Sequence, residues 1–201
     1  FEQGTAECIK SYQEDYDLSS RIGDKPGAAI TAFNLGHAYL GHEVPVLRDL
    51  AQAEVWYQRS LELFDEQDSN RAQCLGQLGL ISYERYKDAY EANAPYDELF
   101  KHLSDAARFY HQELDLLPPD AVDALAMAHN GLGVIYKSVS NLDRALHHYN
   151  QALRYFETTG DFYNAALTRG NVARALVQIG RLSDAREYAY AALRNYEQYG
   201  E

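Results

Sequence analysis

The sequence predicts an all-α fold of about nine antiparallel helices, and three observations support it. Helix-favouring Ala, Leu, Glu, Gln and Arg are abundant, whereas no stretch alternates apolar with polar residues as a strand would. The chain has only 13 glycines and 5 prolines in 201 residues, and they stand with Asn and Asp at regular places. The intervals between these places span 14 to 24 residues, a usual length for helices joined by short turns.

These interruptions define the helices in chain order. Turns are expected at residues 22–27, 41–45, 65–70, 93–95, 118–120, 140–141, 159–161 and 180–181. Residues of the types that cap or begin a helix stand beside four of the turns, at Asp120, Asn141, Asp161 and Ser183. Two prolines suit the first turn of a helix, where no amide hydrogen is needed, at Pro45 and Pro95.

The chain is strongly acidic, with 30 Asp and Glu against 18 Lys and Arg and a formal net charge of −12. Such a surface repels phosphate, so neither nucleic acid nor a membrane surface is an expected partner. The apolar runs are also far shorter than the roughly 20 residues of a membrane-spanning helix. The charge is uneven, because residues 1–120 hold 10 basic and 22 acidic residues whereas residues 121–201 hold 8 of each.

The two cysteines, Cys8 and Cys74, are too few for a disulfide framework. Both are expected to be small buried side chains that pack between helices. This cysteine usage is typical of a reducing compartment, so we expect a cytoplasmic protein. The chain begins with Phe1 rather than methionine and is therefore interpreted as a fragment of a longer one.

A pattern of small residues and tyrosines recurs along the chain. Four times, a Leu-Gly or Val-Ala pair is followed by an alanine and, about one turn later, by a tyrosine. The pairs are Leu35-Gly36, Leu78-Gly79, Leu132-Gly133 and Val172-Ala173, and the alanines are Ala53, Ala106, Ala145 and Ala185. Small residues at these positions let two helices approach closely, while larger Leu and Tyr fill the space between neighbouring pairs.

This pattern resembles the tetratricopeptide repeat, a helix-turn-helix unit with L-G-x2-Y on its first helix and A-x3-F/Y-x2-A on its second. The resemblance implies a right-handed superhelical solenoid of antiparallel helix pairs, with the first helices lining its concave side. The period is 40 residues where it is intact, against about 34 in the usual repeat. The longer form is similar to repeats of Pins-type scaffolds and to those appended to multi-domain signalling NTPases.

On this resemblance, residues 1–201 form a single array of repeats. Residues 1–24 are the second helix of a truncated repeat, and repeats 1 to 4 cover residues 27–66, 70–118, 121–159 and 161–200. In repeat 2 the distance from Gly79 to Ala106 is 27 residues, against 12 from Gly133 to Ala145. Repeat 2 is therefore expected to form an extended helical hairpin that stands about 10 Å above its neighbours.

The resemblance implies a non-enzymatic scaffold for signalling that binds a protein or peptide on its concave face. The apolar positions of that face include Phe33, and its polar positions are Asn34, His37, Gln73, Gln77, Asn130, Lys137, Asn171, Arg174 and Gln178. The alternative is that these Asn and Gln side chains only form hydrogen bonds with the backbone of neighbouring turns. We expect Asn130→Ala with Arg174→Ala to weaken partner binding without changing the melting temperature.

The extended hairpin is a second candidate surface. It carries Tyr83, Tyr86 and Tyr90 at helical spacing, followed by Tyr96, Phe100 and Leu103 on the other arm. We expect these rings mainly to zip the two arms together. Docking of a partner is the alternative, because tyrosine is common at protein interfaces.

Other chemistry has little support in the sequence. Gly131-Leu132-Gly133 lacks the third glycine and the preceding strand of a dinucleotide-binding loop. Histidines at 37, 42, 102, 111, 147 and 148 do not follow a metal-ligand spacing, and neither cysteine lies in a catalytic pattern. We therefore expect no enzyme activity, cofactor or metal.

Two further expectations concern partners. The chain is expected either to be a free scaffold or to be a sensor or autoinhibitory module of a larger signalling or transcription regulator. In the second case the partner is another domain of the same polypeptide. Exposed ends of the solenoid are also expected to permit self-association.

Overall fold

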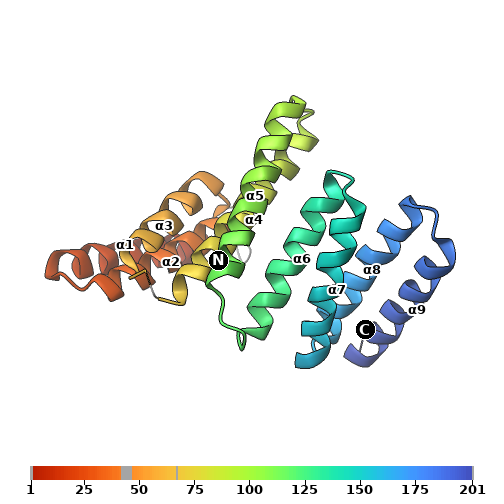
Figure 1. Cartoon of the computed structure of the whole chain (residues 1–201). Coiled ribbons are helices and arrows are strands. Elements are labelled where there is room, and N and C mark those ends of the chain that lie inside the picture. Colours follow the sequence, from red (N-terminus) through yellow and green to blue (C-terminus); the bar gives the residue numbers. More distant parts are fainter. Residues whose placement is uncertain (1, 42–46, 67, 201) are drawn as a thin grey trace. The chain divides into compact units, whose positions relative to one another are not determined.

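The computed structural model describes residues 2–41, 47–66 and 68–200 of the chain. Within these ranges the chain forms nine α-helices and no β-strand (Figure 1). The sequence-based prediction of an all-α chain with about nine helices is therefore confirmed. Two residues discussed above, His42 and Pro45, lie outside the described ranges.

The helices group into two compact units, residues 1–116 and residues 117–201. Unit 1 contains α1 Glu2–Ile22, α2 Lys25–Leu40, α3 Leu50–Leu63, α4 Asn70–Glu91 and α5 Tyr96–Leu116. Unit 2 contains α6 Val122–Ser138, α7 Leu142–Thr159, α8 Phe162–Gln178 and α9 Leu182–Tyr199. In each unit every helix packs against the next one along the chain, and α6 also contacts α8. The single array predicted over residues 1–201 stays a prediction, because each unit is defined by contacts within itself.

Side-chain caps start several helices where the sequence places turns. In unit 2, Asn141 Oδ1 accepts a hydrogen bond from the Arg144 amide at 3.3 Å, and Asp161 Oδ1 accepts one from the Asn164 amide at 2.9 Å. These two predicted caps are confirmed. Ser183 lies in the first turn of α9, while Asp120 precedes α6 and does not cap it. The side-chain oxygens of Asn141 and Asp161 satisfy first-turn amides that have no partner inside the helix.

Glycine on a first helix and tyrosine on the following helix form the centre of three helix pairs. A Cβ at Gly133 would lie 2.5 Å from the ring of Tyr149, and one at Gly36 would lie 2.9 Å from the ring of Tyr57. Both rings are fully buried. Gly79 faces the Tyr110 ring in the same way, at 3.2 Å. The small residues of the repeated pattern thus let each ring lie flat on the neighbouring helix.

The hairpin of α4 and α5 is longer than the other helix pairs. These helices have 22 and 21 residues, whereas α6 and α7 have 17 and 18. The excess corresponds to about 5–8 Å of helix, and Figure 1 shows the α4–α5 turn projecting beyond α3 in the same unit. Ion pairs link α4 to the preceding elements, since Arg48 Nη2 lies 2.9 Å from Asp88 Oδ2 and Arg85 Nη2 lies 2.6 Å from Glu54 Oε2 of α3.

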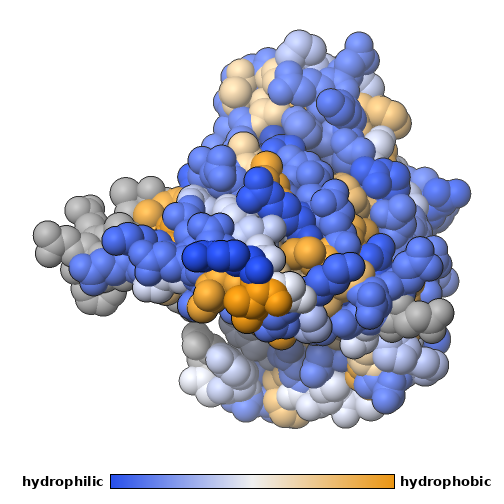
Figure 2. All heavy atoms as spheres, turned by 90° about the vertical axis from the view of Figure 1, so that its left-hand side faces the viewer, coloured by the Kyte–Doolittle hydropathy of each residue, from blue (hydrophilic) through white to orange (hydrophobic). Residues whose placement is uncertain are grey.

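The two cysteines differ in burial. Cys74 is fully buried, as predicted, but Cys8 is exposed, so the prediction that it packs between helices is wrong. The packed stripe of α1 consists of Ile9, Tyr12 and Tyr16, which lie against Ala32, Leu35 and Trp56, and Cys8 stands outside that stripe. Figure 2 views the molecule from the α1 end and shows a mainly hydrophilic face with apolar side chains between the charged ones.

Candidate functional site

In unit 1 the predicted groove residues lie on α2 and α4. His37 and Gln73 are exposed, whereas Asn34 and Gln77 are half-buried. Gln73 helps to line a small pocket of about 170 Å³ between the two helices, whose other lining residues are Ile30, Phe33, Phe64 and Asn70. The structure therefore brings Phe33 and Gln73 together, as the repeat pattern predicts. The pocket has the size of a single apolar side chain.

In unit 2 the structure brings together residues of α6 and α8. Lys137 is half-buried, and burial lowers its pKa, with a further lowering from the charge of Arg174. Arg174 Nη2 in turn donates a hydrogen bond to Asn171 Oδ1. Within the described residues neither Lys137 nor Arg174 forms an ion pair with a carboxylate. Two cations thus lie near each other without a counter-ion.

A groove of about 540 Å³ lies beside Arg174, between α8 and α9. Its lining is mostly apolar and comprises Ala173, Arg174, Val177, Gln178, Leu182, Ala185, Arg186 and Ala189. Arg174 and Gln178 were predicted from the sequence, whereas the α9 residues were not. The repeat pattern predicts binding residues only on the first helix of each repeat. It gives no signal that residues of α9, a second helix, line the groove.

Asn130 makes a contact inside unit 2. Its Oδ1 accepts a hydrogen bond from Oγ1 of Thr168 at 3.2 Å, which joins α6 to α8, and Thr168 is fully buried. Removing the amide would leave a buried hydroxyl without this acceptor, which costs stability. This bond argues against the expectation that Asn130→Ala leaves the melting temperature unchanged.

The rings of the hairpin lie largely on its surface. Tyr83 stacks on Tyr86 with ring centroids 5.7 Å apart, and Tyr86 lies 6.0 Å from Tyr90. Tyr96 is 74% exposed, and Tyr90 and Phe100 are also more than half exposed. The arms are closed instead by Ser82, Ala89, Leu103 and Ala106, which are buried. The interpretation that the rings zip the arms together is wrong for Tyr90, Tyr96 and Phe100, because these side chains are more than half exposed.

Sequence reasoning missed several buried polar groups. Glu113 of α5 is only 6% exposed and lies against Gly76, where a Cβ would be 2.6 Å from Glu113 Oε1. Burial raises the pKa of Glu113 to about 8. In unit 2, Nδ1 of His129 and Nδ1 of His148 lie 3.0 Å apart, and one of them donates to the other. Gly76, three residues before the predicted packing position Gly79, is a sequence signal that could have located the buried carboxyl when taken together with Glu113.

None of the helices in the described ranges is long and apolar enough to span a membrane. No three His, Cys, Asp or Glu side chains in these ranges gather in a way that would hold a metal ion.

Comparison with known protein families identifies the repeats. Residues 123–198 match the family model described as tetratricopeptide repeat. This segment consists of tetratricopeptide repeats. The match covers α6 to α9 almost completely, which are the helices where the 40-residue period is intact. The further resemblance to Pins-type scaffolds stays a prediction.

Solved structures extend the likeness of fold to the tetratricopeptide-repeat proteins beyond that segment. BtubC (BKLC) from P. vanneervenii has a TM-score of 0.70 at 17% identity, over 96% of this chain and 74% of that chain. A putative kinesin light chain from Podospora anserina with nearly identical TPR-like repeats has a TM-score of 0.65 at 13% identity, over 97% and 88%. MamA has 0.62 at 17%, over 92% and 96%. At these identities the likeness shows the fold, and no curated protein sequence matches the chain.

Proposed function

We propose that this chain is a non-enzymatic scaffold that binds a protein or peptide on the face of its first helices, α2 and α4 in unit 1 and α6 and α8 in unit 2. We further propose that unit 2 takes an acidic segment. The tetratricopeptide-repeat match and the TPR-like fold support a role in protein interaction. The groups on these faces are amides, cations, the exposed His37 and apolar side chains, a mixture that suits recognition of a peptide.

The uncompensated pair of Lys137 and Arg174 carries the proposal for unit 2. Neither cation has a carboxylate partner within the described residues, although the chain carries a net charge of −12, and the charge of Arg174 acts on the half-buried Lys137. A half-buried ammonium beside a guanidinium is destabilised by repulsion and by loss of water. A carboxylate of a bound segment would relieve both effects and accept charge-assisted hydrogen bonds.

The apolar groove next to the pair supplies the second element of recognition. Val177 and Leu182 are both more than half exposed and line the groove beside Arg174. An extended or helical segment with a carboxylate beside a branched apolar side chain would satisfy the cations and cover these residues together. Such a pairing of a charged anchor with an apolar contact is common in peptide recognition.

The proposal is tested with two fluorescent pools of short peptides, one carrying glutamate and leucine and the other glutamine and leucine. We expect the glutamate pool to bind more tightly, and its affinity to fall as salt is added. Lys137→Ala with Arg174→Ala should weaken its binding about tenfold or more, since charge-assisted hydrogen bonds are lost. Fluorescence anisotropy measures both effects.

Arg194→Ala is the matched control, because Arg194 is an exposed cation of α9 that does not line the groove. It removes one positive charge from the same unit and should leave the affinity nearly unchanged. Asn130 is kept in all variants because of its bond to Thr168. Equal affinities for the two pools, or equal losses in the Arg194 and Arg174 single variants, would contradict the acidic-segment proposal.

The exposed aromatic side chains of the α4–α5 hairpin form a second candidate contact area. Tyr90 and Tyr96 with Phe100 expose aromatic area at the end of a braced projection. Tyr90→Ser with Tyr96→Ser should change the unfolding free energy by less than about 0.5 kcal/mol, as exposed substitutions usually do. The same variant should capture less partner from a cell lysate than the parent chain. Leu103→Ala, which removes a buried side chain, should instead lower stability clearly.

Urea unfolding followed by the fluorescence of Trp56 reports on unit 1, where the sole tryptophan lies. If Tyr90→Ser with Tyr96→Ser loses as much unfolding free energy as Leu103→Ala, the two rings do hold the arms of the hairpin together. Unchanged partner capture would remove the hairpin from the binding surface.

The alternative in which a neighbouring domain of the same polypeptide occupies these faces makes a separate prediction about context. The full reading frame would then encode a nucleotide-binding or DNA-binding domain beside the repeats, and the glutamate peptides would compete with that domain.

A further inference from the structure

A polar pocket lies in unit 2 on a different side of α8 from Arg174. Its volume is about 400 Å³, and its lining consists of Asn150, Leu153, Arg154 and Glu157 of α7, Arg169 of α8 and Tyr188 of α9. Arg169 and Arg174 are five residues apart on α8, which turns their side chains by about 140° at 100° per residue. The pocket is therefore separate from the groove of the proposed function.

Hydrogen-bond donors outnumber acceptors in this pocket. The Arg169 side chain is only 16% exposed, and its Nη2 donates to Glu157 Oε1. Its Nη1 is buried and has no hydrogen-bond partner among the described residues. The Tyr188 hydroxyl donates to Asn150 Oδ1 at 3.3 Å, and the amide nitrogen of Asn150 is a further donor in the lining. A buried guanidinium with one unsatisfied edge is costly, and a second acceptor would remove that cost.

The net charge of the pocket lining is positive, so charge also favours an acceptor ligand. Arg154 is exposed and forms no ion pair within the described ranges. Two guanidinium groups thus face one carboxylate, that of Glu157, whose side chain is 54% exposed. The planar fork of arginine matches the geometry of carboxylate and phosphate oxygens, so the free edge of Arg169 and the whole of Arg154 suit an oxyanion.

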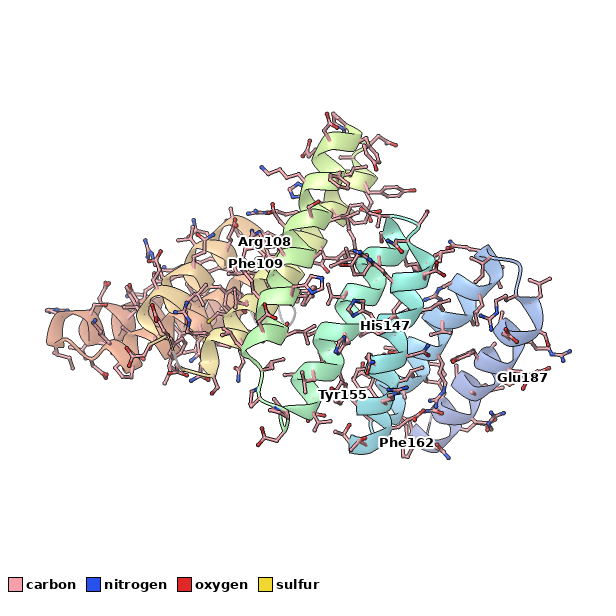
Figure 3. All side chains as sticks on the ribbon, in the orientation of Figure 1. Arg108, Phe109, His147, Tyr155, Phe162 and Glu187 are labelled. Carbon is pink, nitrogen blue, oxygen red and sulfur yellow. The ribbon has the colours of Figure 1, made fainter. Side chains whose placement is uncertain are left out.

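The preceding repeat shows that this polarity is not required for packing. Forty residues before Arg169 and Tyr188, the equivalent positions hold His129 and His148. Their Nδ1 atoms are 3.0 Å apart and satisfy each other by a hydrogen bond, close to His147, which Figure 3 labels on α7. At equivalent positions, one repeat thus joins two histidines by a hydrogen bond, whereas the next repeat leaves Nη1 of Arg169 buried without a partner.

We propose that the pocket between Arg154, Arg169 and Tyr188 binds an oxyanion, the shared group of phosphate and carboxylate ligands. The free Nη edge of Arg169 and the Arg154 guanidinium would donate to its oxygens, and the Asn150 amide nitrogen would add a neutral donor. Glu157 opposes binding by its charge but occupies only the other edge of Arg169. Binding here does not depend on the groove beside Arg174.

The test is an NMR titration of the ¹⁵N-labelled chain at low salt with inorganic phosphate, and in parallel with acetate, against a chloride background. We expect saturable shifts of the Arg154 and Arg169 side-chain signals. Tighter binding of phosphate would assign the site to phosphoryl groups, and tighter binding of acetate to carboxylates. Shifts that rise linearly with every anion, including chloride, would overturn the proposal.

Variants of exposed residues make the test independent of folding. Arg154→Gln should weaken anion binding about tenfold, whereas Glu157→Gln should tighten it because a competing negative charge is removed. Arg194→Gln is the matched control and should leave the shifts of the Arg154 and Arg169 signals unchanged, because Arg194 is exposed and lines neither this pocket nor the groove. If Arg154→Gln has no effect, or if Glu157→Gln weakens binding, the pocket is not an oxyanion site.

Discussion

Glu113→Gln is expected to stabilise unit 1 at pH 8 to 9 by about 3–5 kcal/mol relative to the parent chain, and to have little effect near pH 4.5. Burial raises the pKa of this carboxyl from its ordinary 4.5 to about 8. Glutamine keeps the shape of the side chain over Gly76 and has no charge to bury. The effect is large because each unit of pKa difference corresponds to about 1.4 kcal/mol.

The sign follows from proton binding in the two states. Between pH 4.5 and about 8 the folded chain keeps the Glu113 proton while the unfolded chain has lost it. Unfolding releases a proton in this window, so the contribution of Glu113 to stability is fully present below pH 4.5 and falls as the pH rises. Above the folded pKa both states are ionised and the contribution no longer changes. The glutamine variant lacks this slope.

Urea unfolding at several pH values, followed by Trp56 fluorescence, measures the difference. Glu62→Gln is the control, because Glu62 is an exposed carboxylate of α3 in the same unit. It removes the same charge and should give a curve parallel to that of the parent chain. A Glu113→Gln curve that is also parallel would mean that the carboxyl is already ionised at neutral pH.

The helices and their pairing could be predicted because the repeated positions are set by packing. Gly133 and Tyr149 contact each other as a small residue and a ring, and Gly36 with Tyr57 repeats the contact. Because the same close contact between helices recurs in each repeat, each repeat has the same residue types at these positions, and the sequence shows the pattern directly. Cys8 shows the limit, because α1 packs through Ile9 and the neighbouring position is left exposed.

The candidate site could be predicted only in part, because polar side chains have several ways to be satisfied. Arg174 and Lys137 lie together as their positions on two first helices indicate. Asn130 has the same kind of position, yet its amide accepts a bond from Thr168. The choice between a partner in solution and a partner on the next helix depends on distances of a few ångströms, which spacing along the chain does not determine.

Burial of ionisable groups was even less predictable. Glu113 occupies a second-helix position where other repeats have Ser60 or Ala152. An acidic residue on an amphipathic helix is usually solvated, so composition predicts an exposed side chain. Gly76 makes room for this carboxyl on the opposite helix, and a glycine in a helix has no unique explanation from sequence. Only the pair of positions, seen together, locates the buried group.

Gly133→Ala and Gly170→Ala are expected to change the stability of unit 2 in opposite directions. Both glycines lie inside first helices, Gly133 in α6 and Gly170 in α8. A Cβ at Gly133 would lie 2.5 Å from the buried Tyr149 ring, whereas one at Gly170 would have no atom within 4 Å. The first substitution should destabilise by about 1–3 kcal/mol through overpacking. The second should stabilise by about 0.5–1 kcal/mol, because alanine favours the helix.

Hydrogen exchange of the α6 and α7 amides, followed by mass spectrometry, measures unit 2 separately from the Trp56 signal of unit 1. Exchange should accelerate in Gly133→Ala and slow in Gly170→Ala. Gly79→Ala offers a graded comparison in unit 1, since its Cβ would lie 3.2 Å from the Tyr110 ring and require a smaller shift. If alanine at 133 is as stable as alanine at 170, the ring of Tyr149 moves freely, and close contact between glycine and tyrosine does not determine how these helices pair.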